Sequence, residues 1–434
     1  MNMEEIIRIK RDGGVLTPSE LKYFVHGYVA GEIPDYQASA LLMAIYFQKL
    51  TDTETAELTG LMRYSGDTVD LSEISGIKVD KHSTGGVGDK VTVVLAPILA
   101  ALGLASTKLS GKGLGHTGGT IDKFEAIKGF KFSSSKEEVE KIASKTGIGL
   151  MGYSDKIVPL DKKLYSLRDV TATVPSIPLI ASSIMSKKLA IQSDVIILDV
   201  KVGDGAFMKN IERARELAKR MIEIGIGFKR KVRAVLSNMD EPLGYSVGNA
   251  IEIIEAIETL KGNGAKDVKE VVYTIAAVAL KAKGVIKELK DGYRKIDEVI
   301  NSGLALSKLK EFIAESGGDE NLVNDYSILP VAKEKLEIFS QNSGYVAKIK
   351  AEEIGKAAMI IGAGRATKYD KIDHSVGIKI FKKVGDKVEK GEKLAEIYYN
   401  DEKNLKNSKE MLLDAYVLQN KKVSGQKVVI EIID

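Results

Sequence analysis

The spacing of hydrophobic and polar positions predicts that the first 66 residues form a run of helices. Residues 3–11 are amphipathic and end at a pair of glycines, and capping boxes at 17–20 and 51–54 begin two further helices. Between these boxes, residues 38–45 are apolar nearly all round and include small side chains. That pattern predicts a buried core helix.

The pattern changes after Gly66, where strand-like and helical stretches alternate as far as Pro159. Helices are predicted again at 161–171 and 178–189, and residues 195–200 form a continuous apolar run of the kind buried on both faces of a sheet. Alternation of this type predicts a sheet layered with helices.

Beyond helices predicted at 268–284 and 305–315, the region 317–330 is a candidate domain boundary. After it come short β-rich segments at 344–349, 376–381, 393–399 and 428–433. Residues 382–397, KKVGDKVEKGEKLAEI, resemble the hammerhead of biotinyl and lipoyl carrier domains, but no lysine has the sequence setting that modification requires. We interpret the likeness as shared barrel-sandwich architecture without carrier chemistry.

The predicted fold class is α/β, with three domains that suit a chain of 434 residues. A helical domain combines 1–66 and 160–193. A mixed-sheet α/β domain combines 67–159 and 194–330. A C-terminal α+β, barrel-sandwich-like domain covers 331–434.

Composition narrows the range of partners. The net charge of +4 is small and evenly spread, so no nucleic-acid partner is expected. The chain has no cysteine, which excludes disulfides and thiolate metal sites. No apolar segment suggests a signal peptide or a membrane span. We expect a soluble cytoplasmic protein with no membrane partner.

Two glycine-rich turns carry the candidate chemistry. KHSTGGVGD at 81–89 follows a short β-branched run and precedes a helix, and SGKGLGHTGGT at 110–120 follows a second strand. Small side chains let backbone N–H groups reach an anion, and the helix N-terminus adds partial positive charge. Lys81 supplies a full charge, and Ser83 and Thr92 supply hydroxyl groups. Two such turns at adjacent strand ends predict one phosphate site; the alternative is a pair of tight connections without a ligand.

The sequences of these turns closely resemble those of the thymidine and pyrimidine-nucleoside phosphorylases, which are related to anthranilate phosphoribosyltransferase. The stretches that carry the resemblance are KHSTGGVGDKVT and KLSGKGLGHTGGTIDKFEAI. The resemblance runs from the first helix to the C-terminus. It implies the nucleoside phosphorylase/phosphoribosyltransferase type of fold and reversible phosphorolysis of pyrimidine nucleosides (uridine, thymidine, deoxyuridine) to base and (deoxy)ribose 1-phosphate. It also implies a homodimer, one bound potassium ion per subunit and no organic cofactor.

The resemblance implies two sets of binding residues. Those that would bind phosphate are Lys81, His82, Ser83, Thr92, Lys108, Leu109, Ser110 and Thr120. Those that would bind the nucleoside are Tyr165, Arg168, Ser183 and Lys187, whose spacings of three and four residues place each pair on one helical face. Ordinary solvated surface is the alternative for such pairs. The implied catalytic residues are His82, which would donate a proton or a hydrogen bond toward O2 of the base, and Arg168 and Lys187, which would stabilise its charge.

For the cation, the resemblance implies five ligands that all present oxygen, as a hard cation prefers. They are the backbone carbonyls of Gly88, Lys90, Leu243 and Ser246 and the carboxylate of Glu255. Without the resemblance, Glu255 is an ordinary glutamate on a helix surface.

Three other functions stay open. A related phosphoribosyltransferase would have Lys-His-Gly-Asn where this chain has KLSG at 108–111. A non-catalytic sensor should lack His82, Arg168 or Lys187. A strict thymidine phosphorylase usually has Met at the position of Lys108, so this lysine favours a broader substrate range. His116 is expected to shape a closing lid within the second glycine loop; His26 and His374 are expected to be structural or solvated.

Overall fold

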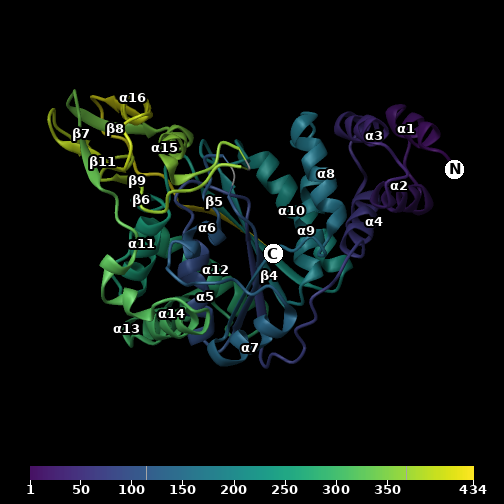
Figure 1. Ribbon diagram of the computed structural model, residues 1–434, viewed down its shortest axis with the longest axis horizontal. Helices are drawn as coiled ribbons and strands as arrows, with labels where there is room; N and C mark the ends of the chain where they lie inside the picture. Colours follow the sequence, from purple (N-terminus) through teal and green to yellow (C-terminus); the bar gives the residue numbers. More distant parts are fainter. Residues whose placement is uncertain (114, 368) are drawn as a thin grey trace.

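The computed structural model describes residues 1–113, 115–367 and 369–434. Leu114, within the predicted glycine lid, lies outside the described residues. The N-terminal helices form one end of the molecule, a layered sheet its middle, and two small sheets, mostly from the C-terminal region, its other end (Figure 1). The three parts of the predicted fold class are therefore present.

The N-terminal region is a bundle of four helices, with both predicted capping boxes formed: Thr17 and Thr51 accept hydrogen bonds from the backbone N–H groups of Glu20 and Glu54. The third helix is buried along its centre, as predicted for residues 38–45. The helices are α1 (Met3–Arg11), α2 (Pro18–Ala30), α3 (Asp35–Gln48) and α4 (Asp52–Arg63).

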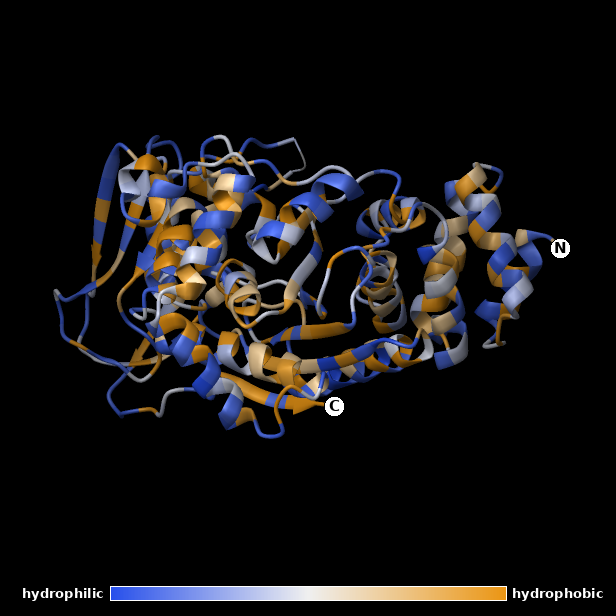
Figure 2. Cartoon of the chain, turned by 90° about the horizontal axis from the view of Figure 1, so that it is seen from below, coloured by the Kyte–Doolittle hydropathy of each residue, from blue (hydrophilic) through white to orange (hydrophobic). Residues whose placement is uncertain are grey.

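The central sheet has the strand order β13-β5-β4-β1-β2-β3. Five strands are parallel and β13 is antiparallel, so the sheet is mixed, as predicted. Its strands are mostly hydrophobic in Figure 2, and every residue of β4 is buried. The strands are β1 (Lys78–Ser83), β2 (Ala105–Ser110), β3 (Ile148–Gly152), β4 (Val195–Val202), β5 (Lys231–Asn238) and β13 (Val429–Ile433).

Helices cover both faces of this sheet. One hydrophobic cluster joins strands to α5 (Val91–Ala101), α11 (Ala250–Leu260), α12 (Lys266–Ala282), α13 (Leu289–Asn301) and α14 (Leu304–Glu315). A second joins β4 and β5 to α9 (Ile177–Ala190) and α10 (Ile211–Gly227). The remaining helices around the sheet are α6 (Thr120–Glu125), α7 (Lys136–Thr146) and α8 (Pro159–Val170).

Helix α9 has two sets of neighbours. It packs against α4 of the N-terminal bundle and also shares the cluster of β4, β5 and α10. Residues 160–193 were predicted to belong to the helical domain, and α9 connects that domain to the sheet.

The C-terminal region has two small sheets, of order β10-β8-β12 and β6-β9-β11-β7, with two helices and a π-helical turn. Short 3-10 helices at Glu320–Val323 and Tyr326–Ile328 occupy the predicted boundary. The elements are β7 (Glu334–Phe339), β8 (Gly344–Ile349), α15 (Ala351–Ala358), η3 (Met359–Ala363), β9 (Gly377–Ile380), β10 (Lys387–Val388), β11 (Lys393–Tyr399), α16 (Leu405–Ala415) and β12 (Tyr416–Gln419).

Two strands cross the predicted boundary between the α/β and C-terminal domains. Strand β6 (Ser246–Gly248), from the α/β segment, pairs with β9 of the C-terminal region. Strand β13, expected within the domain 331–434, instead pairs with β5 of the central sheet. The β-rich composition at 428–433 predicts a strand correctly but does not reveal its partner, because pairing depends on contacts distant in sequence. No helix in the described part of the chain is long and apolar enough to cross a membrane.

Candidate active site

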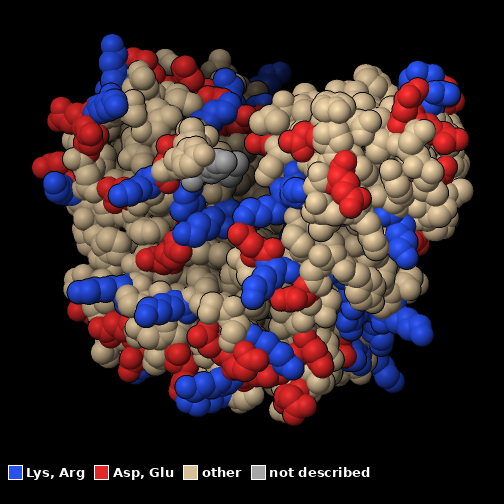
Figure 3. Space-filling view, turned by 45° about the vertical axis from the view of Figure 1, so that its right-hand side comes forward, with Lys and Arg blue, Asp and Glu red and all other residues tan. Residues whose placement is uncertain are grey.

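A cavity of about 690 Å³ lies where the carboxyl ends of β1 and β2 face α8 and α9. Figure 3 shows the hollow between the two halves of the molecule, with basic side chains along it. All the predicted binding residues except Lys81 line this one cavity. They are His82, Ser83, Thr92, Lys108, Leu109, Ser110 and Thr120 from the phosphate set, and Tyr165, Arg168, Ser183 and Lys187 from the nucleoside set.

The phosphate end presents hydroxyl groups from both glycine turns. Ser83 ends β1 and accepts a hydrogen bond from the Gly85 N–H (3.2 Å), which shapes the first turn. The Ser110 hydroxyl is buried and has no hydrogen-bond partner among the described residues. Thr92 lies in the first turn of α5, where the helix dipole favours an anion. An unpaired buried hydroxyl that lines the same cavity as a helix N-terminus suits an anionic ligand.

Lys81 lies behind the cavity lining in the described structure. Its ammonium is 3.1 Å from the Asp199 carboxylate and 3.7 Å from that of Asp89. Burial lowers the pKa of Lys81, but these two carboxylates outweigh the burial and raise it. Lys81 therefore keeps its positive charge beneath the first turn.

Lys108 is a second buried cation at this end. Its Nζ donates to the Lys81 carbonyl (3.0 Å). Burial, with the nearby charge of Lys188, lowers the pKa of Lys108 to about 7. The charge of Lys108 is therefore responsive to pH near neutrality.

His82 lines the same cavity and is close enough to both ends to interact with the charges of Lys108 and Lys187. Burial lowers the pKa of His82 well below its ordinary value, and the positive charges of Lys188 and Lys108 lower it further. The imidazole is neutral at neutral pH, so of the two expected roles the structure favours hydrogen bonding over proton donation.

At the nucleoside end, backbone carbonyls fix the guanidinium of Arg168. Its nitrogens donate to the carbonyls of Val174 (2.7 Å), Leu179 (3.2 Å) and Thr173 (3.5 Å). Burial lowers the pKa of Arg168 to about 10, so it stays charged. Tyr165 is half exposed, with its ring 6.0 Å from the guanidinium carbon.

Lys187 is oriented from two helices. Its Nζ donates to the Ser183 hydroxyl (3.1 Å), one turn earlier on α9, and to the Asp161 carboxylate on α8. The Tyr153 ring lies 5.8 Å away. Neither Asp161 nor Tyr153 was predicted as a site residue. For Asp161 the reason is that the helix dipole already explains an aspartate in the first turn of a helix.

The second glycine loop is attached to the C-terminal region. The Gly115 N–H donates to the Arg365 carbonyl (2.8 Å), and the Arg365 guanidinium contacts the Gly113 carbonyl (3.2 Å) and the Asp122 carboxylate (2.8 Å). The sequence carries no signal that Arg365, distant along the chain, would anchor this loop. His116 follows the anchored glycine, and burial lowers its pKa.

The residues implied as cation ligands also come together, but a lysine ammonium lies among them. Lys90 Nζ is 2.6 Å from the Leu243 carbonyl, 3.1 Å from that of Ser246 and 2.9 Å from the Glu255 carboxylate. Lys90 was expected to offer its backbone carbonyl. Because its own charge already occupies these oxygens, the arrangement does not fit an additional potassium ion.

Comparison with known proteins agrees with this architecture. Residues 4–66 match the glycosyl transferase family helical bundle domain, 75–306 the glycosyl transferase family a/b domain, and 345–419 the pyrimidine nucleoside phosphorylase C-terminal domain. The a/b match includes α8 and α9. Anthranilate phosphoribosyltransferase from Thermus thermophilus has a similar structure, with a TM-score of 0.58 and 20% identity, covering 71% of this chain and 98% of that one. This likeness supports the fold alone.

Curated relatives extend over nearly the whole chain. It is 54% identical over 402 residues to pyrimidine-nucleoside phosphorylase of Bacillus subtilis (strain 168), covering 93% of each chain. It is 52% identical over 400 residues to the enzyme of that name from Staphylococcus aureus (strain MSSA476), covering 92% of each. With all three domain matches in order, the chain belongs to the pyrimidine-nucleoside phosphorylase family.

Proposed function

We propose that this chain catalyses the reversible phosphorolysis of pyrimidine nucleosides, including uridine, thymidine and deoxyuridine, to the free base and (deoxy)ribose 1-phosphate. The observation that carries the proposal is the single cavity lined by an anion-binding end and a cationic base-binding end. A nucleoside placed across it would have its sugar carbon between phosphate and the charged residues of α8 and α9.

At the anion-binding end, phosphate would be the nucleophile. Hydroxyl groups of Ser83, Thr92, Ser110 and Thr120 would orient it, and Lys108 would balance its charge. Phosphate needs only to be held in line with the C1′–N1 bond, so positioning is the main contribution of this end.

At the other end, the breaking bond leaves its electron pair on the pyrimidine. Arg168 and Lys187 would stabilise that negative charge, and both are fixed before the substrate arrives. Fixed cations in a partly dry cavity are effective because they need no reorganisation during the reaction. His82, neutral at this position, would donate a hydrogen bond toward O2.

The test is an ultraviolet assay of base release from uridine, thymidine, cytidine and UMP, each with and without phosphate. We expect uridine and thymidine to be cleaved only with phosphate, or with arsenate in its place. Equal rates in phosphate-free buffer would contradict phosphorolysis.

A strict thymidine phosphorylase is the second candidate. The polar side chain of Lys108 lines the cavity, at a position where the strict enzymes usually have Met. This difference favours a substrate range that includes uridine. Cleavage of thymidine with no detectable cleavage of uridine in the same assay would support the strict enzyme instead.

We further propose a cytoplasmic homodimer. Large hydrophobic side chains are exposed on or next to α3 and α4, notably Tyr36, Phe47 and Tyr64, and exposed apolar surface is typical of an interface. Sedimentation equilibrium should give twice the chain mass of 47.1 kDa. A monomer at micromolar concentration would contradict the dimer.

A further inference from the structure

We propose that the ammonium of Lys90 takes the place of a monovalent cation, so that this protein carries its own tethered cation and needs no potassium. The inference goes beyond the proposed reaction, because it concerns what holds the phosphate turn in place. It rests on the contacts of Lys90 and on the shape of the two loops around it.

The coordination of the ammonium is complete. A lysine ammonium has three N–H donors and is a compact single charge. Three oxygens lie within hydrogen-bond distance of Nζ: the carbonyls of Leu243 and Ser246 and Oε2 of Glu255. No donor remains for water, in agreement with a side chain that is fully buried.

Two glutamates of α11 balance the positive charge of Lys90. Burial lowers the pKa of Lys90, but Glu255 and then Glu252 outweigh the burial and raise it. Glu255 is itself fixed, since its two carboxylate oxygens accept the N–H groups of Tyr245 (2.7 Å) and Ser246 (2.8 Å). The ammonium therefore lies in a rigid anionic cage.

Two glycines leave the space that the ammonium fills. A Cβ on Gly88 (φ 73°) would lie 2.6 Å from the Leu243 carbonyl oxygen and 3.3 Å from Lys90 Nζ. A Cβ on Gly244 (φ 72°) would lie 2.4 Å from Glu255 and 2.8 Å from the same ammonium. Any side chain at either position would displace the charge or its partners.

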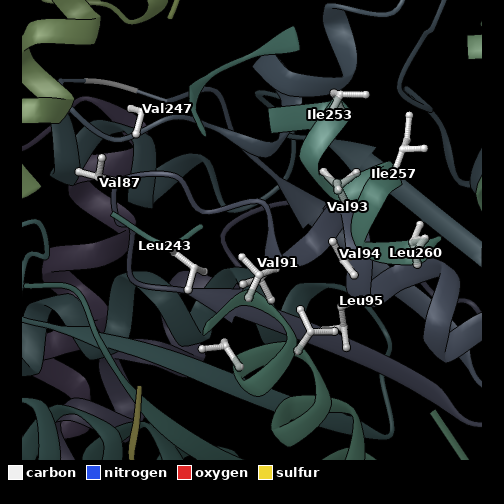
Figure 4. Close-up of a cluster of buried hydrophobic side chains, with 14 of the residues drawn as sticks. Val87, Val91, Val93, Val94, Leu95, Leu243, Val247, Ile253, Ile257 and Leu260 are labelled. Atoms are coloured by element: carbon white, nitrogen blue, oxygen red, sulfur yellow. The ribbon is translucent and has the colours of Figure 1, made fainter. Parts of the chain in front are cut away.

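The surroundings exclude a second ion. Val87, Val91 and Leu243 belong to one buried hydrophobic cluster with Val247 and Ile253 (Figure 4). A second cation beside the ammonium would lose its hydration, because the oxygens of Leu243, Ser246 and Glu255 already bind Nζ. The tethered ammonium also avoids the entropy of capturing an ion from solution.

The contacts of Lys90 connect the phosphate turn to the C-terminal region. Lys90 directly precedes α5, and the Leu243 N–H also donates to the Val87 carbonyl (3.0 Å) within the turn. Ser246 then begins β6, which pairs with β9. Lys90 is thus a positioning residue: it holds the turn against the loop and acts on phosphate only through that turn.

The experiment compares wild type with Lys90→Thr, which removes the charge and keeps the oxygen cage. The salts are potassium, sodium and tetramethylammonium chloride at equal ionic strength, and the readout is the thermal midpoint Tm, which is independent of catalysis. We expect the wild-type Tm to be the same in all three. The Tm of Lys90→Thr should be lower in tetramethylammonium and should rise saturably with potassium.

A matched control is Lys10→Thr. Lys10 is also buried and paired, but with only one carboxylate, that of Glu54 (2.8 Å), and one carbonyl, that of Gly14 (3.1 Å). Its loss should lower Tm without a rescue specific to potassium. Phosphate affinity gives a second readout: Lys90→Thr should lose about tenfold without potassium and recover with it, as coupling between neighbouring sites predicts.

If Lys90→Thr does not fold, a crystallographic measurement on the wild type decides the case. Wild-type crystals soaked in rubidium chloride should show no anomalous peak between Leu243 and Ser246, and crystals of Lys90→Thr, if obtained, should show one. Each of three results would overturn the proposal. They are a rubidium peak there in wild type, a wild-type Tm raised specifically by potassium, and a folded Lys90→Thr variant whose Tm does not respond to potassium. If base release fails in every salt while these results hold, only the proposed reaction is wrong.

Discussion

Lys188 and Asp80 form a completely buried ion pair, with 3.0 Å between Nζ and the carboxylate. Lys188 Nζ also donates to the Leu109 carbonyl (3.2 Å), so one lysine on α9 reaches both strands that carry the phosphate residues. Its neighbour Lys187 faces the cavity. Lys188 thus fixes α9 to the sheet, and the adjacent Lys187 supplies a positive charge at the base-binding end of the cavity.

Removing Lys188 should therefore destabilise the fold strongly. Lys188→Met leaves the Asp80 carboxylate buried without its ion-pair partner, and breaking a buried pair typically costs about 3 to 5 kcal/mol of unfolding free energy. Urea denaturation followed by circular dichroism measures it. Lys187→Met is the matched control: it lies one position away, at the cavity, and should cost much less. A double variant, Lys188→Met with Asp80→Asn, should recover part of the loss; equal stability of all three variants would contradict the role of this pair.

Lys187→Met should instead lower turnover and leave phosphate binding nearly intact. The contact it removes is a preorganised charge, of a kind typically worth about 2.7 to 4 kcal/mol of barrier, or about 10² to 10³ in kcat. Lys81→Met should weaken phosphate binding and leave uridine binding largely unchanged, because Lys81 lies beneath the phosphate turn.

Calorimetric titration of both variants with phosphate and with uridine separates the two effects. Loss of phosphate binding in Lys187→Met together with loss of uridine binding in Lys81→Met would reverse our assignment of the two ends. Normal binding and turnover in both would show that neither lysine has the role implied by the family.

Anion affinity should depend on the charge of Lys108. Burial and Lys188 lower its pKa to about 7, so the ammonium is charged below that pH and neutral above it. Sulfate is a suitable probe, since it stays a dianion throughout this range. Its affinity for wild type should fall as pH rises from about 6 to about 9. Lys108→Met should bind sulfate more weakly and with a flatter pH profile; an unchanged slope would show that another group titrates.

Gly66, between the N-terminal helices and the sheet domain, should not tolerate a side chain. A Cβ there would lie 2.1 Å from the Lys156 carbonyl oxygen and 2.4 Å from Pro159 Cδ. Gly66→Ala should therefore cost about 1 to 3 kcal/mol of stability through overpacking. Gly227→Ala, where a Cβ meets nothing within 4 Å, is the control and should leave the urea midpoint unchanged or slightly higher. Equal midpoints for both variants would contradict this packing argument.

The sequence by itself determined the local elements and the chemistry of the two turns. Capping boxes at Thr17 and Thr51 begin helices because their hydroxyl groups bind backbone N–H groups three residues on, which is a purely local arrangement. The continuous apolar run at 195–200 likewise predicted β4, since such a run is typical of a strand covered on both faces. The family resemblance named the residues that line the cavity, although Lys81, also named, lies behind the lining.

Tertiary structure decided what depends on contacts distant in sequence. The partner of β13 is β5, and the anchor of the second glycine loop is Arg365; neither follows from local pattern. Burial, which the sequence does not state, sets the charge of His82 and Lys108. The direction of one side chain placed Lys90 Nζ, instead of its carbonyl, among the oxygens of Leu243, Ser246 and Glu255, because only the folded loops bring those oxygens together.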